Sequence, residues 1–235
     1  MIEITQLHKT FGKLTVLDGL DLSIKSGGIF AVLGPNGSGK TTLIKCILGM
    51  VIPQKGEIIY DNESIIRKSE SRNKINYMPQ IANFPANLTV IELIEMVKNL
   101  RPKVAKEQGL ISLFGIEPFL TKKLGNLSGG TKQKVNIILA FMFDSDLIIL
   151  DEPTTGLDPI ALIHLKQIIQ EAKAAGKTIL ITTHIMSLVD EIADEIVFLL
   201  DGKIYFKGSV PAIKEQTGEA QLEHAIANLL RKQNV

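Results

Sequence analysis

Cysteine, tryptophan and long apolar runs are scarce or missing in this chain of 235 residues. The single cysteine, Cys46, excludes an internal disulfide, and its aliphatic neighbours predict a buried, unreactive thiol. No apolar run approaches the roughly 18 residues that a membrane-spanning helix needs, and the most apolar stretch, 135–143, is too short. No secretion signal is visible at the N-terminus. Together these absences predict a cytoplasmic protein.

An excess of either charge is missing as well. The chain has 26 basic and 25 acidic residues, which gives a formal net charge of +1. Because a surface that binds nucleic acid is strongly basic, this balance predicts no nucleic-acid partner. Hydrophobic residues make up 45% of the chain, which is sufficient for the core of one α/β domain with an inserted lobe.

Apolar periodicity predicts strands that alternate with helices. We expect strands at 2–7, 14–24, 28–33, 57–60, 75–78, 147–150, 178–182, 195–200 and 203–206. We expect helices at 40–48, from 89 onward, at 102–114, 132–142 and 159–176, and in the tail after Gly218. The predicted organisation is an α/β core at 1–80 and 145–208, a helical subdomain at 81–144 and a short extension at 209–235.

The most informative segment is the glycine-rich loop between the strand at 28–33 and the helix at 40–48. It matches the phosphate-loop pattern G-x-x-x-x-G-K-S/T. Its glycines let backbone N–H groups turn toward phosphate oxygens, and the following helix N-terminus attracts anions. Lys40 supplies a positive charge near the β- and γ-phosphates, and the Thr41 hydroxyl can bind Mg²⁺. The residues predicted to bind a nucleotide here are Gly34, Pro35, Asn36, Gly37, Ser38, Gly39, Lys40, Thr41 and Thr42.

Two carboxylates follow the apolar strand at 147–150. In open α/β sheets, ligands bind beyond the carboxyl ends of the strands. Asp151 is therefore predicted to hold Mg²⁺, and Glu152 to orient and deprotonate an attacking water. Acidic residues also begin many ordinary loops, but a phosphate loop upstream requires a second anchor for its metal ion.

A second glycine pair, Gly129 and Gly130, follows Ser128 at the start of a predicted helix. Such a start is common, and it offers another N-terminus that attracts anions. In the segment Leu127 to Lys134 the sequence resembles the ATP-binding subunits of ABC transporters, whose signature reads L-S-G-G-Q-R-Q-R or close to it. The resemblance implies that two subunits pair head to tail, and that Ser128, Gly129 and Gly130 cover the ATP held by the partner's phosphate loop.

Further motifs of that family match in the expected order, over residues 1 to about 208. The resemblance implies that Gln80 contacts Mg²⁺ and water, and that His184 contacts the γ-phosphate, although a histidine at a strand end is often only a surface group. Asp158 matches a loop across the dimer interface and also suits the N-cap of a helix. Phe11 stands where the family stacks an aromatic ring, more often tyrosine, on adenine. The implied Mg²⁺ ligands are Thr41, Gln80 and Asp151.

The resemblance therefore implies a magnesium-dependent ATPase with four catalytic residues, Lys40, Gln80, Glu152 and His184. The implied fold is an α/β P-loop NTPase core of ABC type, with an N-terminal antiparallel β subdomain and an inserted helical subdomain. The chain is expected to work as a dimer, a homodimer rather than a heterodimer, on the inner face of the cell membrane. A separate transmembrane permease is expected to carry the membrane spans.

In its layout the chain is most similar to exporter subunits that pair with separate six-helix permeases. Within that group it is similar to the subunits associated with copper handling for nitrous-oxide reductase maturation. One alternative is a soluble ABC ATPase that acts on ribosomes or DNA. The second ATPase unit, coiled-coil insertion or basic arms of such proteins are not found in this sequence. Another alternative is a non-hydrolysing, nucleotide-gated switch subunit, against which the intact Glu152 and His184 argue.

Overall fold

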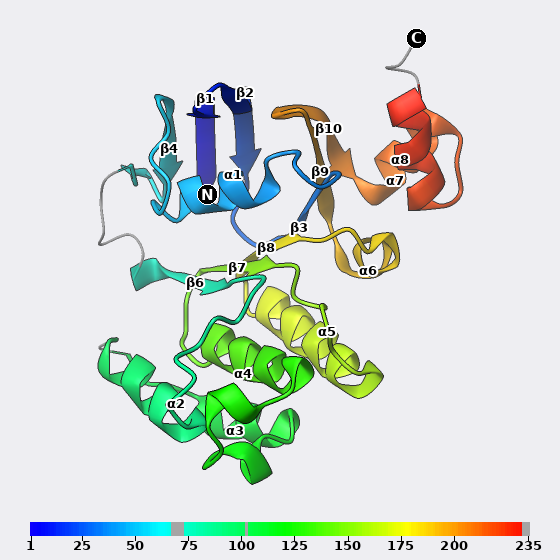
Figure 1. Ribbon diagram of the computed structural model, residues 1–235. Coiled ribbons are helices and arrows are strands. Elements are labelled where there is room, and N and C mark those ends of the chain that lie inside the picture. Colours follow the sequence, from blue (N-terminus) through cyan, green and yellow to red (C-terminus); the bar gives the residue numbers. More distant parts are fainter. Residues whose placement is uncertain (67–72, 102, 232–235) are drawn as a thin grey trace. The chain divides into compact units, whose positions relative to one another are not determined.

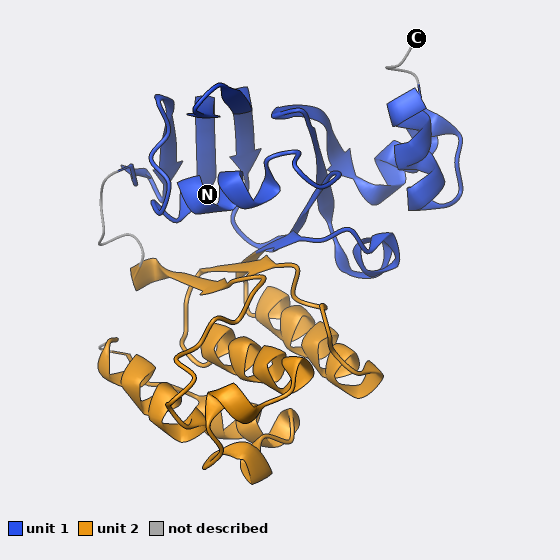
Figure 2. Ribbon diagram, viewed as in Figure 1, with its two compact units in different colours: residues 1–71, 180–235 blue, residues 72–179 orange. Residues whose placement is uncertain are grey.

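The computed structural model describes residues 1–66, 73–101 and 103–231. The chain divides into two compact units, which Figure 2 shows in different colours. Unit 1 comprises residues 1–71 and 180–235, and unit 2 comprises residues 72–179. The start of the expected helix at Pro102 and the end of the expected extension at Val235 lie outside the described residues. Within those residues, no helix is both long and apolar enough to cross a membrane.

Unit 1 contains an antiparallel sheet with the strand order β2-β1-β4-β5. Ile2 and Ile4 pair with Ile24 and Leu22 across β1 and β2, and all four side chains are buried. Alternate residues of a strand share one face, so this spacing gives the sheet one apolar face toward the core. The strands are β1 (Ile2–Phe11), β2 (Leu14–Ile24), β4 (Lys55–Tyr60) and β5 (Glu63–Ser64) (Figure 1).

A parallel strand pair in unit 1 leads to the glycine-rich loop. β3 (Gly28–Leu33) pairs in parallel with β9 (Glu195–Leu200), and β10 (Lys203–Ser209) pairs antiparallel with β9. β3 and β9 are apolar along most of their length, as is usual for parallel strands covered on both faces. Helix α1 (Lys40–Ile47) follows β3 after the glycine-rich loop. A further strand, β8 (Thr178–Thr182), begins in unit 2 and ends in unit 1.

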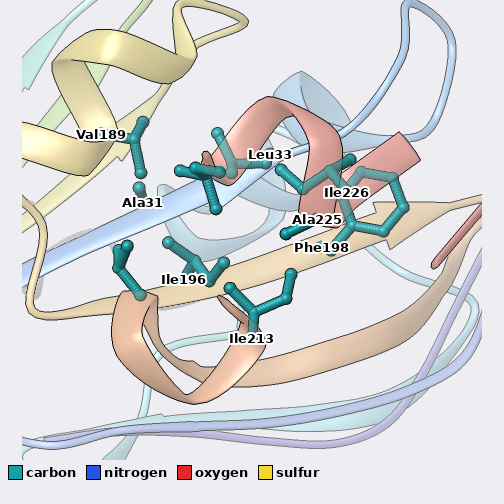
Figure 3. Packing of buried hydrophobic residues seen from close by; sticks show 10 residues of the cluster. Ala31, Leu33, Val189, Ile196, Phe198, Ile213, Ala225 and Ile226 are labelled. Carbon is teal, nitrogen blue, oxygen red and sulfur yellow. The ribbon is translucent and has the colours of Figure 1, made fainter. Parts of the chain in front are cut away.

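The C-terminal helices pack on the β3–β9 pair within unit 1. α8 (Leu222–Arg231) places Leu222, Ala225 and Ile226 at helical spacing in a buried cluster with Leu33 and Phe198 (Figure 3). The sequence predicted this tail helix but not the two short helices before it, α6 (Met186–Ile192) and α7 (Val210–Thr217). The N-terminal end of α7 is set by two residues: the Ser209 hydroxyl accepts from the backbone N–H of Ala212, and a proline lies in the first turn.

Unit 2 contains two parallel strands and four α-helices within its described residues. They are β6 (Ile75–Met78), β7 (Leu147–Asp151), α2 (Val90–Asn99), α3 (Glu107–Leu113), α4 (Gly129–Phe141) and α5 (Pro159–Ala174). α2 opens with the capping box that the sequence predicted, formed by Thr89 and Glu92. The helix expected from 102 onward begins later than predicted, since residues 103–106 are not helical and α3 begins at Glu107. The predicted limits of the helical subdomain, 81–144, stay a prediction.

Candidate nucleotide-binding site

The loop between β3 and α1 depends on glycine at several positions. Gly34, Gly37 and Gly39 have φ angles of 153°, 82° and 107°, which residues with a side chain rarely adopt. A Cβ at Gly34 would overlap the carbonyl oxygen of Leu199, so packing also requires glycine there. A Cβ at Gly37 would meet no described atom within 4 Å. The loop is therefore tightly packed at its start and open at Gly37.

Lys40 closes this loop from the inside. Only 8% of the residue is exposed, and its Nζ atom donates to the carbonyl oxygens of Gly34, at 2.8 Å, and Pro35, at 3.0 Å. The Ser38 hydroxyl is buried and has no hydrogen-bond partner among the described residues. Because buried hydroxyls are nearly always paired, an orphaned one beside a helix N-terminus fits an anionic oxygen ligand such as phosphate. Pro35 and Asn36 are exposed at the tip, and Thr41 and Thr42 are half-buried in the first turn of α1.

Two other predicted residues, Phe11 and His184, belong to the same unit as this loop. Phe11 ends β1 and leaves 50% of its surface exposed. His184 is exposed and follows β8, where the Ile185 N–H donates to the Thr183 hydroxyl at 3.1 Å. That bond spans the histidine and holds the turn that contains it.

The two predicted carboxylates lie at the end of β7 in unit 2, and both are buried. Asp151 is 2% exposed and Glu152 is 6% exposed. Glu152 has a φ of 49°, a left-handed conformation that costs a residue with a side chain about 1–2 kcal/mol. Burial raises the pKa of the Tyr77 phenol to about 12, and the charge of Asp151 contributes in the same direction. The strained conformation at Glu152 turns the chain out of the strand at the point where the sequence predicts the attacking water to be activated.

The signature segment and Gln80 are also found in unit 2. Ser128 caps α4, since its hydroxyl accepts from the backbone N–H of Thr131 at 3.2 Å. Gln80 is exposed, and the residue before it is tied to α4 because Asn136 Nδ2 donates to the Pro79 carbonyl at 2.8 Å. The residue before Gln80 therefore links the end of β6 to α4, the helix that begins in the signature segment.

Asp158 has the structural role that the sequence allowed, the N-cap of α5, where it accepts from the Ala161 N–H at 2.8 Å. It also forms an ion pair with Lys134 of α4, with Nζ and Oδ2 2.7 Å apart. The hydrogen bond from Lys134, followed by that from Ala161, lowers the pKa of Asp158 below its usual value. This ion pair could not be predicted from the sequence, because Lys134 and Asp158 lie far apart in the chain and share no local pattern.

The two signature glycines differ in what they pack against, so we expect substitutions at the two positions to change stability differently. A Cβ on Gly130 would lie 2.7 Å from the Gly156 carbonyl oxygen, whereas a Cβ on Gly129 would meet no described atom within 4 Å. We expect Gly130→Ala to lower the free energy of unfolding by about 1–3 kcal/mol, the usual cost of overpacking. Gly129→Ala is the matched control and should be neutral or slightly stabilising in urea denaturation, because alanine favours a helix. Equal stability of the two variants would contradict the close approach of α4 to the loop at Gly156.

The oxygen donors predicted to bind metal are suited to Mg²⁺. Thr41 offers a hydroxyl oxygen, Gln80 an amide oxygen and Asp151 a carboxylate oxygen, and hard divalent cations prefer oxygen ligands. Unit 1 holds Phe11, the glycine-rich loop and His184, and unit 2 holds Gln80, Ser128, Gly129, Gly130, Asp151, Glu152 and Asp158.

Comparison with known proteins gives consistent matches. The pattern of a family described as "ABC transporter" matches residues 17–155, and one described as "AAA domain, putative AbiEii toxin, Type IV TA system" matches residues 121–190. The lantibiotic transport ATP-binding protein SrtF of Streptococcus pyogenes is 33% identical, over 97% of this chain and 96% of the relative. The Nod factor export ATP-binding protein I of Burkholderia orbicola is also 33% identical, over 91% of this chain and 72% of the relative.

Solved structures agree with the fold. An ATP-binding subunit of an ABC transporter is 30% identical and superposes with a TM-score of 0.91, over 98% of this chain and 99% of the other. A dimeric ATP-binding cassette in a post-hydrolysis state, bound to ADP and Pi, is 26% identical with a TM-score of 0.80, over 89% of this chain and 98% of the other. These likenesses confirm the predicted fold class, an α/β P-loop core of ABC ATPase type.

Proposed function

This chain belongs to the ABC transporter family and is an ATPase that binds ATP, and we propose that it powers export through a separate membrane permease. The proposal of export is supported by the names of two relatives, one a lantibiotic transport protein and the other a Nod factor export protein. Neither name refers to copper, so the similarity to subunits for nitrous-oxide reductase maturation stays a prediction. The proposed location is the inner face of the cell membrane.

The observation that carries the proposed chemistry is the glycine loop closed by the buried Lys40. Phosphoryl transfer to water needs charge neutralisation and positioning more than covalent chemistry. Lys40 and the N-terminus of α1 offset the charge of the phosphates, and His184 helps to position the γ-phosphate. Glu152 accepts a proton from the attacking water. A bound Mg²⁺, held by Thr41, Gln80 and Asp151, would supply further positive charge to the phosphate oxygens.

We further infer that two copies of the chain enclose ATP between them. Each nucleotide on one phosphate loop is covered by Ser128, Gly129 and Gly130 of the other copy, and Asp158 lies near the same boundary. ATP then favours the closed dimer because it contacts both copies, and the copies separate once hydrolysis is followed by product release. The support is a dimeric cassette of similar fold, solved after hydrolysis with ADP and Pi bound. A homodimer is favoured over a heterodimer because the signature segment and Glu152 are both intact.

The permease is proposed to dock on unit 2 around the segment that follows Gln80. Exposed apolar side chains are frequent there, and an exposed apolar surface commonly marks an interaction site. Val104 is 84% exposed, and Met96 and Leu100, at 41% and 73%, lie four residues apart at the end of α2. The segment 83–87 between Gln80 and α2, which has an asparagine at each end and a proline in its centre, is proposed as a further contact.

Purification of the tagged protein from gently solubilised membranes tests this function. We expect a membrane protein with several spans to co-purify in near-stoichiometric amount, as identified by mass spectrometry. Leu100→Asp should reduce its yield at least several-fold, because a charged group would be buried without a partner. Leu14→Asp is the matched control, since Leu14 is 67% exposed but lies in unit 1, and it should retain the permease. Recovery of ribosomal or DNA-repair proteins with no membrane protein would overturn the transport function and favour a soluble ABC ATPase.

A further inference from the structure

Phe11 is an exposed aromatic residue whose surroundings hold it in place. It ends β1, pairs with Leu14 across the hairpin and leaves half of its surface exposed. The Nζ atom of Lys9, two residues earlier on the same face of β1, lies 4.9 Å from the centre of the Phe11 ring. A cation at this distance is attracted to the electron-rich face of the ring. The Lys9 ammonium therefore covers one face of the Phe11 ring, and only the opposite face can accept a flat ligand.

Lys9 is itself anchored by a second contact. The same Nζ atom donates to the carbonyl oxygen of Ile52 at 2.8 Å. A lysine side chain has several rotatable bonds, and most surface lysines sample many conformations. Here the ammonium lies between a backbone carbonyl and an aromatic face, which limits the side chain to a small range of positions. That restriction extends to the ring it contacts.

Gln54 fixes the backbone at the end of β1 in a comparable way. Its Oε1 atom accepts from the Thr10 N–H at 3.0 Å, and its Nε2 atom donates to the Thr10 carbonyl at 2.9 Å. The Gln54 N–H in turn donates to the His8 carbonyl at 2.9 Å. One side-chain amide therefore makes the paired bonds that a neighbouring strand residue would make. The residue next to Phe11 is held at both its donor and its acceptor.

Ile52 and Gln54, which hold Lys9 and Thr10, belong to the segment that follows helix α1. α1 begins with Lys40 in the phosphate loop and ends at Ile47, and the chain then passes through Met50 and Ile52 to β4. The turn is closed by bonds from the Met50 and Val51 N–H groups to the Lys45 carbonyl, at 2.8 and 3.0 Å. The chain that leaves α1 thus supplies the Ile52 carbonyl and the Gln54 side chain, which hold Lys9 and Thr10 beside Phe11. Helix α1 and strand β1 both lie in unit 1 (Figure 2).

We propose that Lys9 and Gln54 are positioning residues that hold the Phe11 ring ready to stack on the adenine of ATP through the face opposite Lys9. The inference rests on the proposed function, in which Phe11 receives the base. Stacking on a ring that is already fixed avoids the loss of side-chain freedom on binding, which increases affinity. Because every base has a flat π-face, the platform stacks on a base without reading its exocyclic groups. ATP and GTP therefore gain equally from it.

The test compares steady-state hydrolysis of MgATP by the wild type, Lys9→Met and Lys9→Arg. Lys9→Met keeps the apolar stem and removes the charge, so KM should rise about 2- to 5-fold with kcat unchanged. Lys9→Arg keeps a cation that stacks on aromatic rings and should restore the wild-type KM. Gln54→Ala should raise KM in the same range. Lys55→Met, an exposed lysine on the neighbouring strand β4, is the matched control and should leave KM unchanged.

Inorganic tripolyphosphate, which has no base, separates the platform from the phosphate loop. Its inhibition constant should be the same for wild type and Lys9→Met, because the phosphate loop is unaltered. An equal rise in this constant and in the KM for ATP would show that Lys9 acts on the phosphates and would overturn the proposal. So would an unchanged KM in Lys9→Met when Phe11→Ala raises KM about 5- to 100-fold, the effect of losing base stacking. An unchanged KM in Phe11→Ala would instead remove Phe11 from the proposed site, and the inference with it.

Discussion

Glu152→Gln is expected to slow ATP hydrolysis by about 10²- to 10⁴-fold while ATP binds as tightly as to the wild type. Glutamine has nearly the same shape as glutamate but cannot accept a proton from the attacking water. Glu152 is 6% exposed and held at a φ of 49° beyond the end of β7, so its carboxylate position is set by the strand and the turn after it. Phosphate release under saturating ATP measures the turnover, and equilibrium binding of ATP measures the affinity.

The control for this variant is Glu215→Gln, which makes the same chemical change on the exposed side of α7. Its turnover should equal that of the wild type. Thermal unfolding of Glu152→Gln should also match the wild type, which shows that the loss is one of chemistry rather than of folding. A turnover within tenfold of the wild type would remove Glu152 from the role of general base.

Lys40→Ala should act on binding rather than on chemistry alone, and we expect ATP affinity to fall about 10- to 100-fold. The variant removes a positive charge that reaches the inner side of the loop, where Nζ contacts the carbonyl oxygens of Gly34 and Pro35. Charge-assisted hydrogen bonds to phosphate oxygens are among the strongest that a side chain makes. Isothermal titration of the variant with MgATP gives the dissociation constant directly.

Lys45→Ala is the matched control for Lys40→Ala. Lys45 lies five residues further along α1 and is exposed, so its removal changes the net charge equally and leaves the loop intact. Its ATP affinity should equal that of the wild type at physiological ionic strength. If the two variants bind ATP equally well, Lys40 has no specific role at the phosphates and the loop must bind nucleotide by its backbone alone.

Much of this fold could be predicted because its signals are local. The strands at 28–33 and 147–150, the helix after Lys40 and the capping box at Thr89 each follow from periodicity or from residues within one turn. The phosphate loop was predicted from its glycines, and their positive φ angles give the physical reason for them. The carboxylates after β7 were predicted from their place at a strand end.

The features that the sequence could not predict depend on residues that are distant in the chain. Lys134 and Asp158 form an ion pair across two helices, and Gln54 completes the strand that ends at Phe11. Helix α6 has only seven residues, too few for periodicity to distinguish it from a loop. The start of α3 at Glu107 was missed because the apolar pattern alone does not mark a helix end.

We propose that ATP joins two copies of this chain, each with its signature segment on the other's nucleotide. Light scattering of Glu152→Gln during size-exclusion chromatography measures this pairing, because the variant should hold ATP without consuming it. The predicted result is the mass of one chain without nucleotide and of two chains with saturating MgATP, and a return to one chain when Ser128→Arg is added. If the variant binds ATP at full affinity but keeps the mass of a single chain at every concentration, ATP does not join two copies.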